Sequence, residues 1–347
     1  MVGELIRKSK LINNSFNTSY INLLASKKVN TTGKLDLRKL WRYFGIILKL
    51  KTQLIFKRPV LCYFALSTTG LAFIKDAFLV GLIKLFHVPI LFHLHNKGVK
   101  IYAKKKIFKF LYKFVFKGTR VILLSERLYD DVSEFVAKGQ THICPNGVPE
   151  LTITNKKNKL NKSEPLQLLF LSNLIESKGV YVLLKALKLL KTRGILFKCN
   201  FIGDTGDINQ ASFESKLRSL GLTSEVMFLG PKYGKDKHQF FLNSDIFVFP
   251  TYYQNETFGL VNLEAMQYSL PVVSTFEGGI PDVIEDGFNG FLVPQKNVKL
   301  LADKLEFLIK NDDLRLKMGA SGKQKFKKEF TSDTFEKTLN SILLNKV

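Results

Sequence analysis

The sequence predicts an α/β fold of two domains, each built on a parallel sheet with helices on both faces. The length of 347 residues corresponds to about two domains of ~150 residues each. Near-continuous apolar runs alternate with helical patterns, as in parallel sheets that are buried on both faces. The polar stretch ELTITNKKNKLNKSEP, rich in Lys and Asn, separates the two halves. We therefore expect domains at 1–150 and 166–330, a linker at 151–165 and a C-terminal helix at 331–347.

Seven short apolar runs, bounded by turn signals, predict the strands. They are PILFHLH (89–95), RVILLS (120–125), LQLLFLSNL (166–174), FKCNFIGD (197–204), EVMFLG (225–230), DIFVFP (245–250) and LPVVST (270–275). An earlier run at 60–74 is shorter than the ~20 residues that a membrane-spanning helix needs. It predicts a buried strand, a turn at Thr69 and Gly70, and the start of a helix. Further helices are expected at 179–194, 212–222 and 260–269, and beyond about residue 312.

The charge is distributed unevenly along the chain. Residues 1–150 hold 26 Lys and Arg against 8 Asp and Glu (+18), whereas the remainder holds 27 against 21 (+6). This asymmetry predicts that the first half meets an anionic partner, which could be a membrane face, a nucleic acid or an anionic glycolipid. Three cysteines without metal-ligand spacing and an N-terminus without a secretory pattern favour the cytoplasm.

Two glutamates stand eight positions apart in NETFGLVNLEAM (255–266). Glu256 follows the predicted strand at 245–250, and Glu264 lies one to two turns into the helix that comes next. Ligands of parallel sheets bind beyond the carboxyl ends of the strands, and the start of a helix suits a phosphate group. The pair therefore predicts a site for a sugar phosphate, with two surface glutamates as the alternative.

The chain continues with PVV, GGIPDVIEDG and GFLV in that order. Together with ETFGLVNLEAM, this set resembles the signature of the retaining family-4 glycosyltransferases of the GT-B fold, Glu-x7-Glu and its followers. The resemblance covers nearly the whole chain, because ICPNGVPE (143–150), LSNLIESKGVYVLLKAL (171–187) and FIGDTGD (201–207) also match the family pattern.

The resemblance implies two Rossmann-like domains that face each other across a cleft. It also implies a hexosyltransferase that moves a sugar from a nucleotide-diphosphate sugar to a hydroxyl of a glycan or lipid-linked acceptor, with anomeric retention. Surface polysaccharide biosynthesis is the implied pathway. The two-carboxylate mechanism of retaining glycosidases, with carboxyl groups about 5 Å apart, has no evident counterpart in this sequence. Same-face attack assisted by the leaving phosphate is expected instead.

Site residues follow from the resemblance position by position. Glu256 would accept hydrogen bonds from the donor sugar, Lys178 would neutralise the leaving diphosphate and Glu264 would hold the ribose. Donor binding is also implied for Gly203 near the base, for Thr257, and for the backbone N–H groups of Phe258, Gly259 and Leu260 on the diphosphate. The family has an Arg five positions before the Lys, where this chain has the neutral Asn173. Either another cation compensates or the phosphate clamp is weaker.

His93 and His95 alternate on one predicted strand and therefore share a face. They could form a structural pair at the strand end, but the resemblance implies that His95 faces the donor sugar at the reaction centre. No third metal ligand accompanies them in the sequence. The resemblance implies that neither a metal nor another cofactor is needed, because the helix dipole and the lysine replace a divalent ion. On family frequency alone, it also implies a UDP-linked donor more than a GDP-linked one.

Residues 96–120 contain eight lysines interleaved with aromatic and aliphatic residues. A helix with lysines on one side and aromatics on the other would suit an anionic membrane interface. The alternative is a core-facing helix with a solvated lysine face. Family resemblance favours peripheral attachment to the inner face of the plasma membrane.

Two rival functions remain. A catalytically silent GT-B protein that binds nucleotide sugars would explain Asn173. A basic nucleic-acid-binding protein rests on charge alone, because the sequence has no helix-turn-helix, zinc-finger or aromatic RNA-binding signature. No nucleic-acid partner is therefore expected.

The family's first domain opens with a strand and a Gly-rich loop, whereas MVGELIRKSKLINNSF (1–16) already reads as the following helix. Because a missing central strand leaves backbone groups of its neighbours unpaired, we expect about 15–20 further residues upstream. The intact mass of the natural protein tests this expectation. A mass that matches Met1 as the first residue would contradict it.

Overall fold

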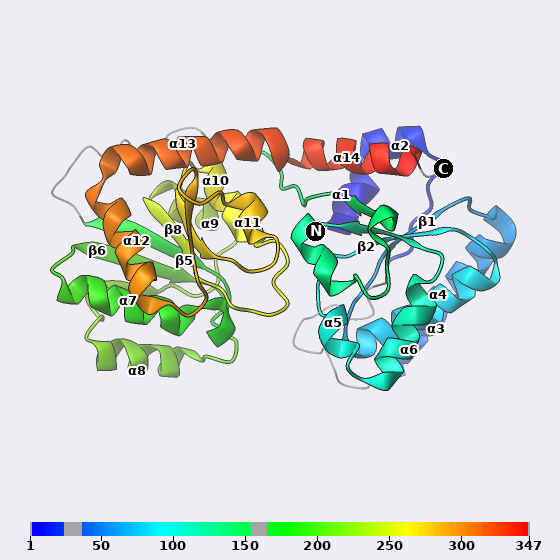
Figure 1. The fold of residues 1–347 in the computed structure, drawn as a ribbon, viewed down its shortest axis with the longest axis horizontal. Helices are drawn as coiled ribbons and strands as arrows, with labels where there is room; N and C mark the ends of the chain where they lie inside the picture. The colour runs from blue at the N-terminus through cyan, green and yellow to red at the C-terminus, as the bar shows by residue number, and fades with distance from the viewer. Residues whose placement is uncertain (1, 24–36, 154–164, 346–347) are drawn as a thin grey trace. The chain divides into compact units, whose positions relative to one another are not determined.

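The computed structural model describes residues 2–23, 37–153 and 165–345, and it divides into two compact units. The first unit comprises Met1–Leu123, Tyr129–Cys144 and Glu336–Val347, and the second comprises Leu124–Leu128 and Pro145–Phe335 (Figure 1). The chain passes from the first unit to the second between Cys144 and Pro145. Most of the linker expected at 151–165 lies outside the described residues.

The first unit contains a four-stranded parallel sheet in the order β1-β2-β3-β4. The strands are β1 (Cys62–Ala65), β2 (Ile90–His93), β3 (Arg120–Leu123) and β4 (Thr141–Ile143). Its helices are α1 (Val2–Lys8), α2 (Lys10–Ser15), α3 (Leu37–Thr52), the π-helical turn Gln53–Lys57, α4 (Gly70–Leu85), α5 (Val99–Tyr102) and α6 (Lys106–Phe116), with 3₁₀ turns at Glu126–Asp131 and Lys138–Gln140. The prediction for 60–74 is confirmed, since β1 is followed by a helix that begins at Gly70.

The helices α4 and α6 connect consecutive parallel strands, and each buries one apolar stripe against the sheet. On α4 the buried stripe includes Phe73, Val80 and Ile83, which recur at helical spacing. On α6 the buried residues are Tyr112, Val115 and Phe116. Right-handed crossovers between neighbouring parallel strands place both helices on the same face of the sheet.

The expected division of residues 96–120 into a lysine side and an aromatic side is wrong. This segment forms α5, α6 and the start of β3, and apolar residues occupy both sides of α6. The exposed side carries Ile107, Phe110 and Phe114 together with its lysines. The lysines and exposed aromatics therefore share one solvent-facing surface.

The second unit contains a six-stranded parallel sheet in the order β10-β9-β8-β5-β6-β7. The strands are β5 (Leu166–Leu171), β6 (Phe197–Ile202), β7 (Val226–Phe228), β8 (Ile246–Phe249), β9 (Val272–Thr275) and β10 (Gly290–Val293). From β5 the chain passes to β6 and then to β7 on one side of the sheet. It then returns to form β8 on the other side of β5. The boundary between β5 and β8 is thus a topological switch point, where ligands of open α/β sheets bind.

Eight α-helices are described in the second half of the chain. They are α7 (Val180–Thr192), α8 (Gln210–Leu220), α9 (Gly234–Leu242), α10 (Leu260–Gln267), α11 (Ile280–Val283), α12 (Val298–Lys310), α13 (Asp312–Glu329) and α14 (Ser332–Leu344). The strands β8 and β9 are buried along their whole length, as expected for strands covered on both faces. The residues of α14 from Glu336 onward group with the first unit, where the hydroxyl of Ser9 bonds the Glu336 carboxylate.

Among the described residues, no helix combines the length and apolarity that crossing a bilayer requires.

The core of the second unit contains a cluster of aromatic side chains from β5, β6 and α8. Phe201 is fully buried, and its ring centroid lies 4.9 Å from Phe170 and 5.1 Å from Phe213. Phe201→Ala should lower the free energy of unfolding by about 3–5 kcal/mol, because it leaves a cavity that these rings cannot fill. Chemical denaturation followed by circular dichroism measures this loss. Leu196→Ala, at a 73% exposed position, is the control and should change stability by less than about 0.5 kcal/mol. Equal effects of the two substitutions would contradict this account of the core.

Candidate active site

Lys178 is carried by a short turn at the switch point of the second unit. The 3₁₀ turn Glu176–Lys178 follows β5 and ends at Gly179, which has φ +90°. A Cβ on Gly179 would lie 2.2 Å from the carbonyl oxygen of Pro250, at the end of β8. The N–H of Tyr252 also donates to the Ser177 carbonyl at 2.7 Å. The absence of a side chain on Gly179 therefore allows the two loops to pack backbone against backbone.

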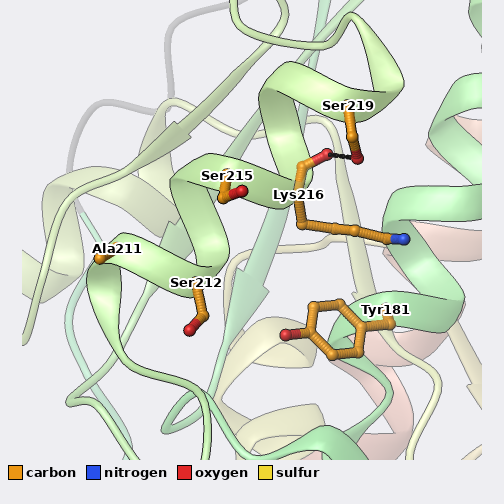
Figure 2. A pocket seen from close by; sticks show the side chains of 6 residues that line it. All are labelled: Tyr181, Ala211, Ser212, Ser215, Lys216 and Ser219. Atoms are coloured by element: carbon orange, nitrogen blue, oxygen red, sulfur yellow. Dashed lines mark hydrogen bonds between the residues drawn. The ribbon is translucent and has the colours of Figure 1, made fainter.

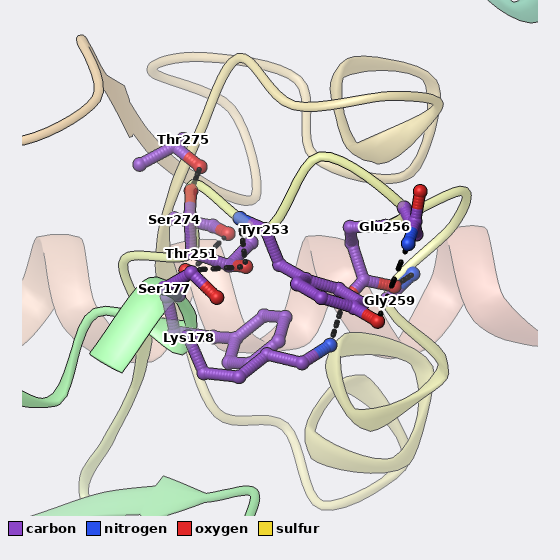
Figure 3. A network of polar contacts seen from close by, with 10 residues as sticks. Ser177, Lys178, Thr251, Tyr253, Glu256, Gly259, Ser274 and Thr275 are labelled. Carbon is purple, nitrogen blue, oxygen red and sulfur yellow. Dashed lines mark hydrogen bonds and ion pairs between the residues drawn. The ribbon is translucent and has the colours of Figure 1, made fainter. Parts of the chain in front are cut away.

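This close packing brings Lys178 to Glu256. The Lys178 Nζ lies 2.6 Å from Glu256 Oε2, and the two side chains are 16% and 13% exposed. The same Nζ lies 4.3 Å from the ring centroid of Tyr253, a cation–π contact (Figure 3). Loss of one partner would leave a largely buried charge uncompensated, so the two residues depend strongly on each other.

Glu256 also organises the start of α10. Its Oε1 accepts the N–H of Gly259 at 3.1 Å, a contact visible in Figure 3. Gly259 has φ +64° and occupies the N-cap position of α10 without a side-chain cap. One of the three backbone N–H groups predicted for the diphosphate is therefore bonded to Glu256 in this structure. The first N–H groups of any helix have no partner within the helix, so the start of α10 retains the character of an anion site.

The side chains of Thr257 and Phe258 belong to the interior. Thr257 is 7% and Phe258 is 1% exposed, and the Phe258 ring lies 5.8 Å from that of Phe330. The Gly278–Gly279 turn supports this loop: a Cβ on Gly278 would lie 2.4 Å from the Glu256 carbonyl oxygen. The N–H of Gly279 donates to the Thr257 carbonyl at 2.7 Å. Phe258 can thus offer a ligand its backbone but not its ring.

The second glutamate has a partner that the sequence analysis missed. Lys237 on α9 donates to both oxygens of Glu264, at 2.9 and 3.0 Å. The two side chains are 24% and 18% exposed. Lys237 lies within the FLGPKYGKDKHQFF segment that precedes β8, together with two other lysines. Its charge was visible in the sequence, but the packing that selects it was not.

Asn173 and Gly203 lie together beyond the ends of β5 and β6. The Asn173 Oδ1 accepts the N–H of Asp204 at 3.2 Å. A Cβ on Gly203 would lie 2.0 Å from the Ser172 carbonyl oxygen, and Gly203 has φ +154°. Asn173 therefore links the segments that follow β5 and β6 in this structure, a contact that does not require a cation.

In the first unit, His93 and His95 share a face as predicted, with ring centroids 4.1 Å apart. His93 is fully buried, and its Nδ1 lies 2.6 Å from the hydroxyl of Tyr63 on the neighbouring strand. Burial lowers the pKa of His93 well below its ordinary value, and nearby His95 lowers it further. Burial also raises the pKa of Tyr63 well above its ordinary value. Both rings of the Tyr63–His93 contact are therefore neutral near pH 7, whereas His95 is partly exposed.

A shallow depression of about 480 Å³ lies between α7 and α8, away from these residues (Figure 2). Its lining combines one residue of α7 with five of α8: Tyr181, Ala211, Ser212, Ser215, Lys216 and Ser219. None of the predicted site residues lines it. The Ser219 hydroxyl is bonded to the Lys216 carbonyl at 2.9 Å, and we assign the depression no function.

A family model described as glycosyl transferases group 1 matches residues 152–325, half of the chain. The chain belongs to the group 1 glycosyl transferases. The matched segment contains β5 to β10 and both ion pairs described above. The family is one of transferase enzymes, so the resemblance to glycosyltransferases drawn from the sequence is confirmed at this level.

Curated relatives of this group 1 glycosyl transferase include a capsular polysaccharide biosynthesis glycosyltransferase, CapM of Staphylococcus aureus. It is 30% identical over 173 residues, which are 50% of this chain and 44% of CapM. An uncharacterized glycosyltransferase of Methanocaldococcus jannaschii is 28% identical over 245 residues, or 70% of this chain and 65% of the relative. The matches thus span less than two thirds of these relatives' lengths.

Solved structures confirm the fold of this glycosyl transferase. Anabaena HepE in complex with UDP has a TM-score of 0.73 at 20% identity, with 87% of this chain and 82% of that chain covered. Sucrose-phosphate synthase from Thermosynechococcus elongatus has a TM-score of 0.72 at 18% identity, with 90% and 80% covered. These similarities establish the two-domain α/β architecture of the GT-B type as predicted.

The burial of neutral His93 predicts a pH dependence of stability. Because its pKa is lowered in the folded state, an unfolded chain binds an extra proton below its pKa of about 6.5. The free energy of unfolding should therefore fall as the pH drops below 6.5, by up to ~1.4 kcal/mol per pH unit for one proton. Urea unfolding of the full chain between pH 7.5 and 5.5 measures the slope.

His93→Gln is the matched variant, since the amide keeps a polar side chain but cannot titrate. It should flatten the fall of stability below pH 6.5, whatever its effect at pH 7.5. A His93 ring that titrates near 6.5 in NMR spectra of the folded protein would refute the prediction.

Proposed function

We propose that this group 1 glycosyl transferase moves a sugar from a UDP-linked donor to a hydroxyl group of a glycan or lipid-linked acceptor, with retention at the anomeric carbon. The observation that carries the proposal is the Lys178–Glu256 pair, held at the switch point beside the start of α10. A cation, a carboxylate and a helix N-terminus meet there. These are the groups that a diphosphate attached to a sugar requires.

The two ion pairs suggest how the site prepares for the donor. In the structure Lys178 neutralises Glu256, and Lys237 neutralises Glu264. When the donor binds, the diphosphate takes the place of the carboxylate as partner of the Lys178 ammonium. Glu256 is then able to accept hydrogen bonds from the sugar hydroxyls. Each charge keeps a partner throughout, so the site avoids the cost of an isolated buried charge.

The chemical step would depend on stabilising the departing diphosphate. Lys178 and the N–H groups at the start of α10 are fixed before the donor arrives, so they need little reorganisation as negative charge develops. No metal or other cofactor is part of the proposal, because the diphosphate charge is met by these groups. His95 would contact the donor sugar at the reaction centre.

The remaining donor contacts are proposed from their positions around the two pairs. Glu264 would hold the ribose hydroxyls, with Lys237 beside it as the additional cation that Asn173 does not supply. Gly203 would lie next to the base, at the turn where the Ser172 carbonyl packs against its backbone. Thr257, Phe258, Gly259 and Leu260 would contribute through the loop backbone.

Surface polysaccharide assembly is the pathway we propose. Support comes from CapM, described as a capsular polysaccharide enzyme, and from WcaL of Salmonella typhimurium, described as a putative colanic acid biosynthesis glycosyltransferase. HepE of Anabaena was solved with UDP and glucose, which supports a nucleotide-sugar donor. The chain would act on the cytoplasmic side, peripheral to the plasma membrane through the basic segment 96–120.

A catalytically silent protein that binds nucleotide sugars is the second candidate. It is favoured by Asn173, which stands where the resembled family has an Arg and makes a structural hydrogen bond. This candidate predicts donor binding without transfer. The nucleic-acid-binding alternative is not favoured by the family match.

Calorimetry with a panel of UDP- and GDP-linked sugars tests the donor site. Glu264→Ala should weaken binding of the preferred donor by at least about tenfold, since a charge-assisted hydrogen bond to the ribose is lost.

Lys178→Met should lower the transfer rate by about 10²–10³-fold with a smaller loss of donor affinity. Release of UDP in the presence of lipid-linked sugars measures transfer.

Glu214→Ala on α8 and Lys188→Met on α7 are the matched controls, because Lys188 is exposed and the half-buried Glu214 accepts a hydrogen bond from Gln210 on its own helix, outside both ion pairs. They should bind the donor and turn over like the unmodified protein. Donor binding with no transfer to any acceptor would favour the silent protein. The absence of binding to every nucleotide sugar would refute both candidates.

A further inference from the structure

Three helices of the first unit each expose an apolar stripe on the side opposite the residues that pack on the core. The stripes recur at the three- and four-residue spacing of a single helix face. We call them together the outer face. Its members, exposed by 39% to 73%, are Trp41, Phe44 and Leu48 on α3, Leu71, Ile74, Phe78 and Leu85 on α4, and Ile107, Phe110 and Phe114 on α6.

The three helices are neighbours, so the stripes form one surface. The hydroxyl of Tyr43 on α3 donates to the Lys75 carbonyl on α4 at 2.7 Å. The Lys84 Nζ at the end of α4 donates to the carbonyls of Phe114 and Lys117, at 2.6 and 2.7 Å. Figure 1 shows α3, α4 and α6 together in the first unit. Each packs its opposite side on the core of that unit.

The outer face lies in the most basic part of the chain. Residues 41–120 contain sixteen Lys and Arg and one acidic residue, Asp76, giving a formal charge of +15. Asp76 is only 8% exposed, and its carboxylate accepts the Ser67 N–H at 2.9 Å. Asp76 is thus the single acidic residue of α3, α4 and α6. Glu134 pairs with Lys109 of α6 at 2.6 Å, and the surface around the apolar stripes keeps a large excess of positive charge.

We infer that the outer face docks on an anionic phospholipid membrane, with its apolar side chains in the interface and its cations on the headgroups. Contiguous exposed apolar surface indicates an interaction site. Two copies of the chain meeting through this face would oppose two strongly positive surfaces. A nucleic acid would satisfy the cations but would leave aliphatic residues such as Leu71 and Ile107 without partners. A lipid interface satisfies both requirements.

This inference goes beyond the proposed reaction and does not depend on it. It also extends the membrane contact beyond the basic segment 96–120, because α3 and α4 supply most of the apolar members of the outer face. Docking through three adjacent helices would hold the first unit against the bilayer over a broad area. Sugar transfer and membrane docking can therefore fail separately.

The only tryptophan of the chain, Trp41, is 73% exposed in the outer face and serves as the probe. Vesicles of phosphatidylcholine with about 30% phosphatidylglycerol should shift its emission to shorter wavelength, because the indole leaves water for the interface. Lipids brominated on the acyl chain should quench it. Pure phosphatidylcholine vesicles should bind at least about tenfold more weakly, since the electrostatic attraction is lost.

Phe78→Ser with Phe110→Ser should weaken partitioning into the anionic vesicles by about tenfold or more, while all cations are kept. The matched control is Leu196→Ser with Leu316→Ser, two apolar positions of the second unit that are 73% and 67% exposed, and it should bind like the unmodified protein. Circular dichroism verifies that both pairs of variants are folded.

Three outcomes would overturn the inference. One is equal binding to anionic and zwitterionic vesicles. Another is co-sedimentation with anionic vesicles without any change in Trp41 emission, which would mean purely electrostatic contact. The third is a dimer without lipid that the Phe78 and Phe110 substitutions dissociate, which would assign the outer face to a second copy of the chain.

Discussion

The ion pair between Lys178 and Glu256 is the interaction around which the second unit is arranged. It joins loops that follow β5 and β8, two strands far apart in sequence and adjacent in the sheet. A lysine and a glutamate with exposures of 16% and 13% must remain paired or find new partners, because an isolated buried charge is costly. A diphosphate and a sugar offer such partners, and this makes the pair suitable for a donor site. The second pair, Lys237 with Glu264, repeats the same arrangement on the neighbouring helices.

Glycines make these pairs possible. At Gly179, Gly203 and Gly278, an added Cβ would lie 2.0–2.4 Å from a backbone carbonyl oxygen, and each residue has a positive φ. The strand-end loops therefore approach one another more closely than side chains would allow. The space that a side chain would need at each position is occupied by a carbonyl group of the neighbouring loop. All three positions fall within the motifs that carry the resemblance to the glycosyltransferases.

The first unit is organised on different physical terms. Its sheet holds a buried neutral His93 bonded to Tyr63, and its helices carry cations and apolar side chains on the same solvent-facing surface. The second unit has nearly balanced charges and contains the ion pairs. The proposed membrane contact therefore falls to the first unit and the proposed donor site to the second. The formal charge of the sequence follows the same division, with +18 on residues 1–150 and +6 on the remainder.

Local patterns determined much of the protein. Short apolar runs sufficed to predict β2, β3, β5 to β9 and the alternation with helices, because parallel strands buried on both faces are apolar along their length. The spacing of Glu256 and Glu264 and the following motifs identified the family. Helix α3 was not predicted from the sequence. Only the tertiary structure decided that Lys237 is the lysine paired with Glu264, that the Gly259 N–H is bonded to Glu256, and that lysines and aromatics share one side of α6. Each of these depends on which segments meet in space, and spacing along one segment does not contain that information.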